Sequence, residues 1–113
     1  MVDLSLMPEV FEVERGPDQT TVTVNAAMTF GRLAELLEPE RLALFNTGSL
    51  PHISIAGAVA TGTHGSGNDN PSLASAVTAF DVVRSDGHVR VADARSLRAG
   101  AVSLGALGVI THL

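Results

Sequence analysis

The sequence of 113 residues contains no cysteine, no lysine, no tryptophan and no tyrosine. Without cysteine there is no disulfide, no thiol nucleophile and no thiolate metal site. Without lysine there is no Schiff-base amine and no phosphate-binding lysine of the P-loop kind. Acidic residues outnumber basic ones by 12 to 7, so electrostatic binding to nucleic acid or to an anionic membrane is not expected.

Long apolar runs are also missing. No stretch approaches the roughly 18 to 20 residues that cross a bilayer. The N-terminus has no basic region followed by an apolar stretch, as a signal peptide would. Hydrophobic residues nevertheless make up 45% of the chain, which is enough to form a core. We therefore expect one globular domain, or part of one, and a cytoplasmic location.

Charge is distributed unevenly along the chain. Between residues 42 and 80 the only aspartate, glutamate, lysine or arginine is Asp69, and small residues dominate. Glycine, alanine, serine and threonine allow backbone to come close to other backbone or to a ligand. This segment is expected either to be buried or to surround a ligand.

Local patterns predict an α+β fold with a mainly antiparallel sheet and flanking helices. Thr29 is a suitable cap for an amphipathic helix. The expected elements are a hairpin of 11–14 and 21–24, a helix from 30 to near Pro39, a buried strand at 42–45, a short helix at 55–60, a hairpin of 77–83 and 89–91 with a tight turn at Asp86-Gly87, and a strand at 108–113. The last strand ends on the final residue, which suggests a truncated unit.

The segment 49–67 carries the chemistry. Successive backbone N–H groups at glycine-rich bends and helix ends form donor sites for anions, phosphate above all. Ser54, Thr61, Thr63 and Ser66 add hydroxyl donors without adding charge. The glycines run G-x-x-G-x-G, which is not the dinucleotide fingerprint. From these residues alone, a phosphate-binding loop and a surface loop without a ligand both remain open.

Two other kinds of site are not favoured. His52 and His64 lie twelve residues apart, with only Asp69 near them as a further ligand, so no metal site is predicted. Ser66 lies between two glycines, but the G-x-S-x-G pattern of a nucleophile elbow is not met. No residue of the chain is predicted to be catalytic.

The run SLPHISIAGAVATGTHGSG, followed by SLASAV and SLGALGVIT, resembles the flavin-binding domain of the alditol oxidases. These enzymes belong to the vanillyl-alcohol oxidase type, which has the p-cresol methylhydroxylase fold and also includes aldonolactone oxidases. The resemblance implies FAD as the cofactor and Ser49 as a contact to a polyol substrate. It implies FAD contacts from Ser49, Ser54, Gly57, Thr61, Gly62, Thr63, His64 and Ile110.

The resemblance also implies an incomplete enzyme. Residues 1–113 correspond to the second flavin subdomain, whereas the family's flavin-linking histidine loop and its substrate domain have no counterpart. In the family, substrate is oxidised by hydride transfer to the flavin, and oxygen then yields hydrogen peroxide. The expected function is the FAD-binding part of a polyol oxidase, inactive alone and completed by a complementary polypeptide or by the missing domains.

Two alternatives remain open, a sugar-1,4-lactone oxidase of the same family and a non-catalytic nucleotide- or phosphate-binding fragment. In either case the missing parts would leave an uncovered surface. We therefore expect an open, apolar-lined groove beside residues 49–64, with exposed alanine, valine and isoleucine side chains.

Overall fold

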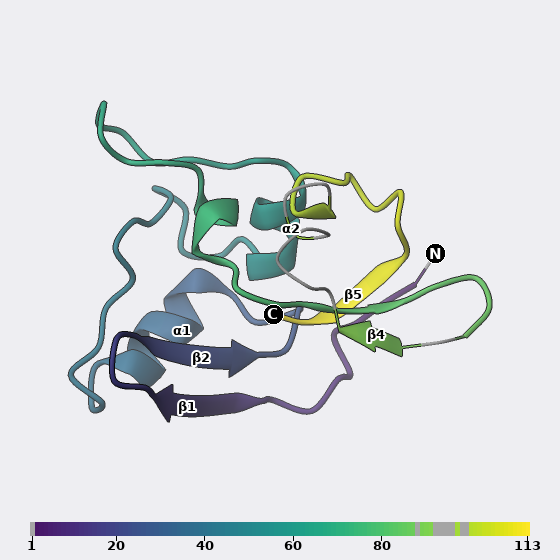
Figure 1. Ribbon diagram of the computed structural model, residues 1–113, viewed down its shortest axis with the longest axis horizontal. Coiled ribbons are helices and arrows are strands. Elements are labelled where there is room, and N and C mark those ends of the chain that lie inside the picture. The colour runs from purple at the N-terminus through teal and green to yellow at the C-terminus, as the bar shows by residue number, and fades with distance from the viewer. Residues whose placement is uncertain (1, 88, 92–96, 98–99) are drawn as a thin grey trace.

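The computed structural model describes residues 2–87, 89–91, 97 and 100–113 (Figure 1). Its first two strands, β1 (Phe11–Arg15) and β2 (Thr20–Val24), form the expected antiparallel hairpin. The alternation that predicts it is visible in the structure, because Phe11 and Val13 are partly buried while the glutamates between and after them are exposed. The backbone N–H of Gly16 donates to the carbonyl of Gln19 at 2.9 Å and closes the turn.

A second sheet follows with the strand order β4-β3-β5. It consists of β3 (Asp81–Val83), β4 (Val89–Val91) and β5 (Val109–His112), all antiparallel. The expected two-residue turn at Asp86-Gly87 is wrong. The N–H of Gly87 donates to the carbonyl of Arg84, so the turn is centred one residue earlier, and Gly87 takes a φ of 76° just after it.

The two sheets are joined end to end by backbone hydrogen bonds. Val24 and Leu113 exchange both of their N–H···O bonds, at 2.9 and 3.0 Å, and the N–H of Ala26 donates to Thr111 at 2.8 Å. Figure 1 shows the C-terminus close to the end of β2. Every strand pair in the described residues is antiparallel, so the α+β class is confirmed.

Two helices supply the main core. Thr29 caps α1 (Phe30–Leu37) and Ser54 caps α2 (Ile55–Ala60), as the sequence predicts for Thr29. A 3₁₀ turn, η1 (Leu73–Ala76), packs beside α2. Burial of each large apolar side chain contributes about 1.5 to 3 kcal/mol. The buried residues from the two helices are Phe30, Leu33, Leu37, Ile55, Ala58 and Val59. None of the described helices is both long and apolar enough to cross a membrane.

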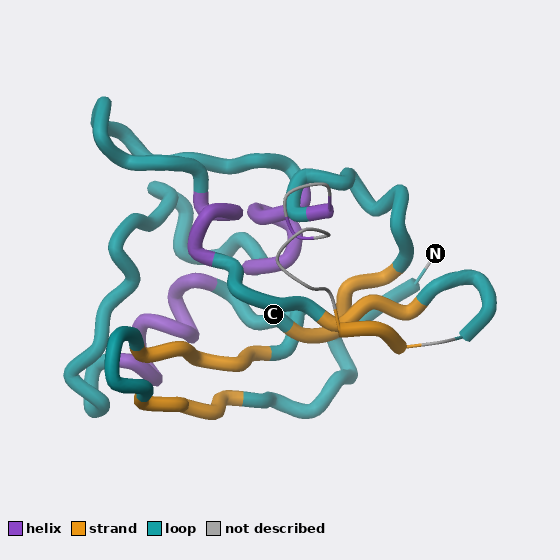
Figure 2. Tube along the Cα trace, viewed as in Figure 1, coloured by secondary structure: helices purple, strands orange, loops and turns teal. Residues whose placement is uncertain are grey.

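The connection between the helices differs from the expectation. Residues 42–45 form no strand and run as an irregular loop (Figure 2). Leu42 and Leu44 pack against the core, but Phe45 is 56% exposed. Burial therefore alternates along this loop because one side of it packs against the core. No strand in the described part of the chain pairs with it to supply the hydrogen bonds that a β-strand needs.

Candidate functional site

The first turns of the two helices meet at a single point of the fold. Thr29 and Ser54, the two capping residues, form an isolated antiparallel bridge. Backbone bonds on both sides hold it, from Phe30 N–H to Ile53 at 3.2 Å and from Ile55 N–H to Met28 at 2.8 Å. The first-turn N–H groups of both helices already have partners, which are backbone carbonyls and the two cap hydroxyls. The partial positive charge at the start of α1 and the hydrogens of the cap hydroxyls are what this junction offers an anion.

A groove of about 760 Å³ lies over this junction. Its walls come from the start of both helices, from the connection between β2 and α1, from the N-terminal segment and from the entry into β5. The residues of the fold that line it include Asn25, Ala26, Ala27, Met28, Thr29, Arg32, Ser54, Ala56, Gly57, Ala60, Gly105, Gly108, Val109 and Ile110. Its volume lies in the usual range for ligand sites, about 300 to 1,000 Å³.

The structure brings three of the predicted cofactor residues together in this groove. Ser54, Gly57 and Ile110 all line it, although Ile110 lies more than fifty positions from the others in sequence. Ser54 Oγ accepts the N–H of Gly57 at 3.2 Å. A hydroxyl that accepts one hydrogen bond still has its own hydrogen to donate, so Ser54 retains a donor for a ligand.

The other predicted residues lie at the opposite end of α2. Thr61 Oγ1 donates to the carbonyl of Gly57 at 2.9 Å and lies 3.1 Å from Thr63 Oγ1. Gly62 has a φ of 68°, a conformation that favours glycine. His64 is exposed, and its Nδ1 lies 3.0 Å from the carbonyl oxygen of Gly65. These residues do not line the groove over the helix junction.

Ser49 is exposed and belongs to this second region. A Cβ on its neighbour Gly48 would lie 3.6 Å from the Thr63 side chain. Gly65 allows this region to pack closely, because a Cβ there would collide with the Asn46 amide oxygen and lie 2.7 Å from the Thr47 carbonyl oxygen. The Asn46 amide in turn donates to the Pro71 carbonyl at 2.9 Å.

The expected open groove is present, but its lining differs from the expectation. Ala56 and Ala60 face it and are partly buried. The expectation of exposed valine and isoleucine side chains is wrong for Ile55 and Val59, which are 7% and 2% exposed and belong to the core. The helix has two faces, and only the one with small residues is left for the groove.

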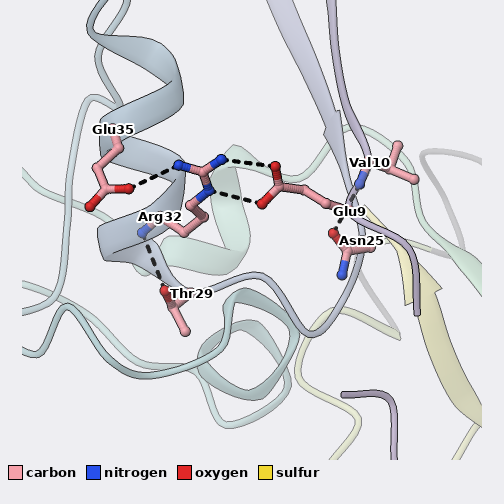
Figure 3. Close-up of polar contacts among 6 residues, drawn as sticks. All are labelled: Glu9, Val10, Asn25, Thr29, Arg32 and Glu35. Atoms are coloured by element: carbon pink, nitrogen blue, oxygen red, sulfur yellow. Dashed lines mark hydrogen bonds and ion pairs between the residues drawn. The ribbon is translucent and has the colours of Figure 1, made fainter. Parts of the chain in front are cut away.

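An ion-pair network at the rim was not expected from the sequence (Figure 3). Arg32 donates to both carboxylate oxygens of Glu9 at 2.8 and 3.0 Å, and to Glu35 at 3.0 Å. The hydrogen bonds from Arg32 lower the pKa of Glu9, and those to both carboxylates raise the pKa of Arg32. The Arg32–Glu35 spacing is readable along a helix, whereas Glu9 lies 23 residues away and only the fold brings it there.

The described part of the chain holds no group of three or more histidine or acidic side chains placed to bind a metal. Arg32 is the only basic side chain among the residues of this part that line the groove, and two carboxylates already bind it. The groove thus offers an anion mainly neutral side-chain donors, because the first-turn N–H groups of both helices are already bound within the fold.

Comparison with known proteins identifies the family. Residues 1–93 match the family described as FAD binding domain. The chain therefore belongs to this family, and FAD is confirmed as its cofactor. It is 50% identical over 95 residues to an alditol oxidase from a Streptomyces species, a match that covers 82% of this chain and 23% of the relative. This confirms the resemblance to the alditol oxidases.

Two further relatives carry the names of lactone enzymes. The chain is 35% identical over 116 residues to an L-gulono-1,4-lactone dehydrogenase from Mycobacterium tuberculosis, covering 100% of this chain and 26% of the relative. It is 32% identical over 114 residues to the L-gulonolactone oxidase of Mus musculus, covering 97% and 26%. The chain thus spans about a quarter of the length of the curated relatives that it matches.

The groove over the helix junction fits the phosphate part of FAD by its donor chemistry. The cap residues Thr29 and Ser54 meet there, and each hydroxyl accepts a backbone N–H and keeps its own hydrogen as a donor. Gly57 is exposed on the groove wall, and a Cβ there would come within 2.8 Å of Ser54 Oγ. The glycine therefore keeps both the backbone and the capping hydroxyl accessible to a ligand.

Proposed function

We propose that this chain is the second flavin-holding subdomain of an FAD-dependent oxidase that acts on the CH–OH groups of polyols. The observation that carries the proposal is the 50% identity to an alditol oxidase. The relatives named for lactones are less similar, at 29 to 35%. The polyol is therefore preferred as substrate, and a sugar-1,4-lactone is the second candidate.

In this proposal the chain's residues hold the cofactor. FAD supplies the hydride acceptor when it is bound. Ser54, Gly57 and Ile110 contact its dinucleotide part in the groove, with the Ser54 hydroxyl as a donor. The region of Thr61, Gly62, Thr63 and His64 contacts a further part of the cofactor, and Ser49 beside it contacts both cofactor and substrate.

The remaining parts of the oxidase lie outside this chain in the proposal. Residues 1–113 form a partial FAD-binding domain, and the first flavin subdomain and the substrate domain come from further sequence or from a complementary polypeptide. We place the oxidase in the cytoplasm. Part of the cofactor surface then stays in water when this chain acts alone, so its affinity for FAD is far below that of the complete domain.

Quenching of flavin fluorescence tests the proposal. FAD is titrated into the chain alone and into the chain joined to the upstream flavin subdomain of an alditol oxidase. We expect weak quenching in the first case, tight quenching in the second, and no polyol-dependent peroxide from the chain alone. Tight stoichiometric FAD binding or peroxide production by the chain alone would refute the proposal that the rest of the oxidase lies outside this chain.

A matched pair of glycine variants tests the assignment of Gly62. Gly62→Val and Gly87→Val both place a β-branched residue at a positive φ, 68° and 76°. The completed oxidase is this chain together with the first flavin subdomain and the substrate domain that the proposal places outside it. In that protein, Gly62→Val abolishes FAD loading because the valine side chain blocks the close approach of the backbone to FAD. Gly87→Val loads FAD normally, since it lies in the turn after β3. Normal loading by Gly62→Val would show that the region 61–64 is not a cofactor contact.

A substrate panel separates the polyol from the lactone. The completed oxidase is assayed for peroxide with sugar alcohols and with 1,4-lactones at equal concentration. A higher kcat/KM for sugar alcohols supports the proposal, and a higher value for lactones supports the second candidate. Tight FAD binding with turnover of neither would identify a non-catalytic nucleotide-binding unit.

A further inference from the structure

Asn25 is a buried polar residue with half of its hydrogen-bonding capacity unused. It is 5% exposed, and its Oδ1 accepts the backbone N–H of Val10 at 3.2 Å (Figure 3). Its amino group has no partner among the described residues. No buried side-chain nitrogen or oxygen in this part of the chain lacks a partner, so the amino group must be reached by solvent. Asn25 is also one of the residues that line the groove.

Thr29 presents a second unused donor on the same wall. Its Oγ1 accepts the N–H of Arg32 at 3.2 Å and so caps α1, which leaves the hydroxyl hydrogen free. Ser54, its partner across the bridge, is in the same position at the start of α2. Three side chains that each use their acceptor within the fold thus keep a donor for the groove.

We propose that Asn25 and Thr29 are two further cofactor-binding residues, which donate hydrogen bonds to the pyrophosphate oxygens of FAD beside Ser54. The inference rests on the proposed function. An unpaired amide donor in a nearly buried position is costly unless a polar group satisfies it. A pyrophosphate has only acceptors, so it matches donors whose own acceptors are already occupied.

The charged groups around the groove are compatible with this role. Glu9 and Arg32 neutralise each other at the rim, and Glu35 binds the same guanidinium. Asp3 accepts the backbone N–H of Ser5 at 2.9 Å and is exposed. The neutral donors of Asn25, Thr29 and Ser54 remain as the groups that bind the anion.

Site-specific NMR on the unmodified chain tests the proposal without a mutation. Its four asparagines and one glutamine give five side-chain amide signals. On titration with FAD, and with ADP as a pyrophosphate probe, the amide of Asn25 and the backbone N–H groups of Thr29, Ser54 and Gly57 shift together. Riboflavin, which has no phosphate, leaves the Asn25 amide unchanged.

The outcomes separate this inference from the proposed function. Shifts at Ser54 and Gly57 without shifts at Asn25 and Thr29 would overturn the inference and leave the FAD site intact. If no signal shifts with millimolar FAD, both the inference and the proposed function are refuted. An Asn25 shift with riboflavin as large as that with FAD would also overturn the inference, because the pyrophosphate would then not be the group bound.

Variants measure the size of the effect. Asn25→Asp keeps the acceptor for Val10 but replaces the donor by a carboxylate oxygen, so FAD affinity falls by more than about tenfold. Asn70→Asp is the matched control, since Asn70 is exposed outside the groove and its amide donates to Ser66. Its affinity stays equal to that of the unmodified chain; an equal loss in both variants would refute the assignment of Asn25.

Thr29 is tested by removing its hydroxyl and by keeping it. Thr29→Val lowers FAD affinity by about three- to tenfold, whereas Thr29→Ser retains the cap and the donor and binds as before. Thermal unfolding is followed in parallel, because loss of the cap alone would lower stability. Equal FAD affinity of Thr29→Val and Thr29→Ser would show that Thr29 is only a helix cap.

Discussion

Gly57 offers a test of the helix junction in which stability and binding respond differently. It is the third residue of α2, and its N–H is the one that Ser54 Oγ caps. A Cβ at this position would lie 2.8 Å from Ser54 Oγ, too close for both atoms to stay. In Gly57→Ala the serine side chain must rotate away, and the capping hydrogen bond is lost.

Two opposing effects determine the stability of Gly57→Ala. Alanine in place of glycine in a helix stabilises by up to about 1 kcal/mol. Loss of a serine cap destabilises by about 1 kcal/mol. The free energy of unfolding should therefore change by less than about 0.5 kcal/mol in this variant, because the two effects offset each other.

The double-mutant cycle with Ser54→Ala isolates the contact. Ser54→Ala alone loses about 1 kcal/mol, which lowers the melting temperature by about 4 °C for a domain of this size. Once the hydroxyl is gone, Gly57→Ala meets no obstruction and stabilises by close to 1 kcal/mol. The expected coupling between the two substitutions is thus about 1 kcal/mol.

Urea unfolding followed by circular dichroism measures the four proteins of the cycle. FAD affinity should fall in both variants that carry Gly57→Ala, whatever their stability, because the added methyl group enters the groove wall. A Gly57→Ala effect on stability that is the same with and without the Ser54 hydroxyl would refute the reasoning.

Three further substitutions probe other parts of the structure. Gly65→Ala should lower the free energy of unfolding by about 2 kcal/mol or more, because its Cβ would collide with the Asn46 amide oxygen; an unchanged urea midpoint would contradict this close approach. Val59→Ala should cost about 2 kcal/mol in the same assay, since Val59 is 2% exposed, and a loss below about 0.5 kcal/mol would be inconsistent with a core position. Glu9→Gln tests the rim: the pKa of Glu9 is lowered from 4.5 by Arg32, so the ion pair stabilises the fold above pH 4.5 and this contribution is lost as the pH falls below it. Unfolding curves between pH 3 and pH 6 should be less pH-dependent in Glu9→Gln, and identical pH profiles would exclude a stabilising role for the pair.

The local elements were readable from the sequence because their causes are local. Alternation of apolar and polar residues predicts the β1–β2 hairpin, and a threonine before an amphipathic run predicts α1. The wrong prediction of a strand at 42–45 has a non-local cause. Residues 42–45 alternate in burial like a strand, but a strand also needs a partner, and whether one is near is not a local property.

The candidate site likewise has one part that could be predicted from local sequence and one part that depends on the fold. Its glycine-rich segment is one run of consecutive residues that resembles the alditol oxidases, which is why Ser54 and Gly57 could be predicted as cofactor contacts from the sequence. Asn25 carried no signal, because a lone asparagine after a strand is typical of a turn. Its unused amide becomes apparent only when Val10 occupies the other end and the groove opens beside it.

The antiparallel α+β elements could be predicted from the sequence by itself, since they depend on residue types at short spacing, and the resemblance of residues 49–67 to the alditol oxidases identified the family and the cofactor. The tertiary structure decided which of the predicted residues meet. Hydrogen bonds between Val24 and Leu113, nearly ninety positions apart, bring Ile110 beside the helix junction, whereas Thr61 to His64 lie at the far end of α2. Such pairings depend on how the sheets join and on which helix face the core buries, and these are set by packing over the whole chain.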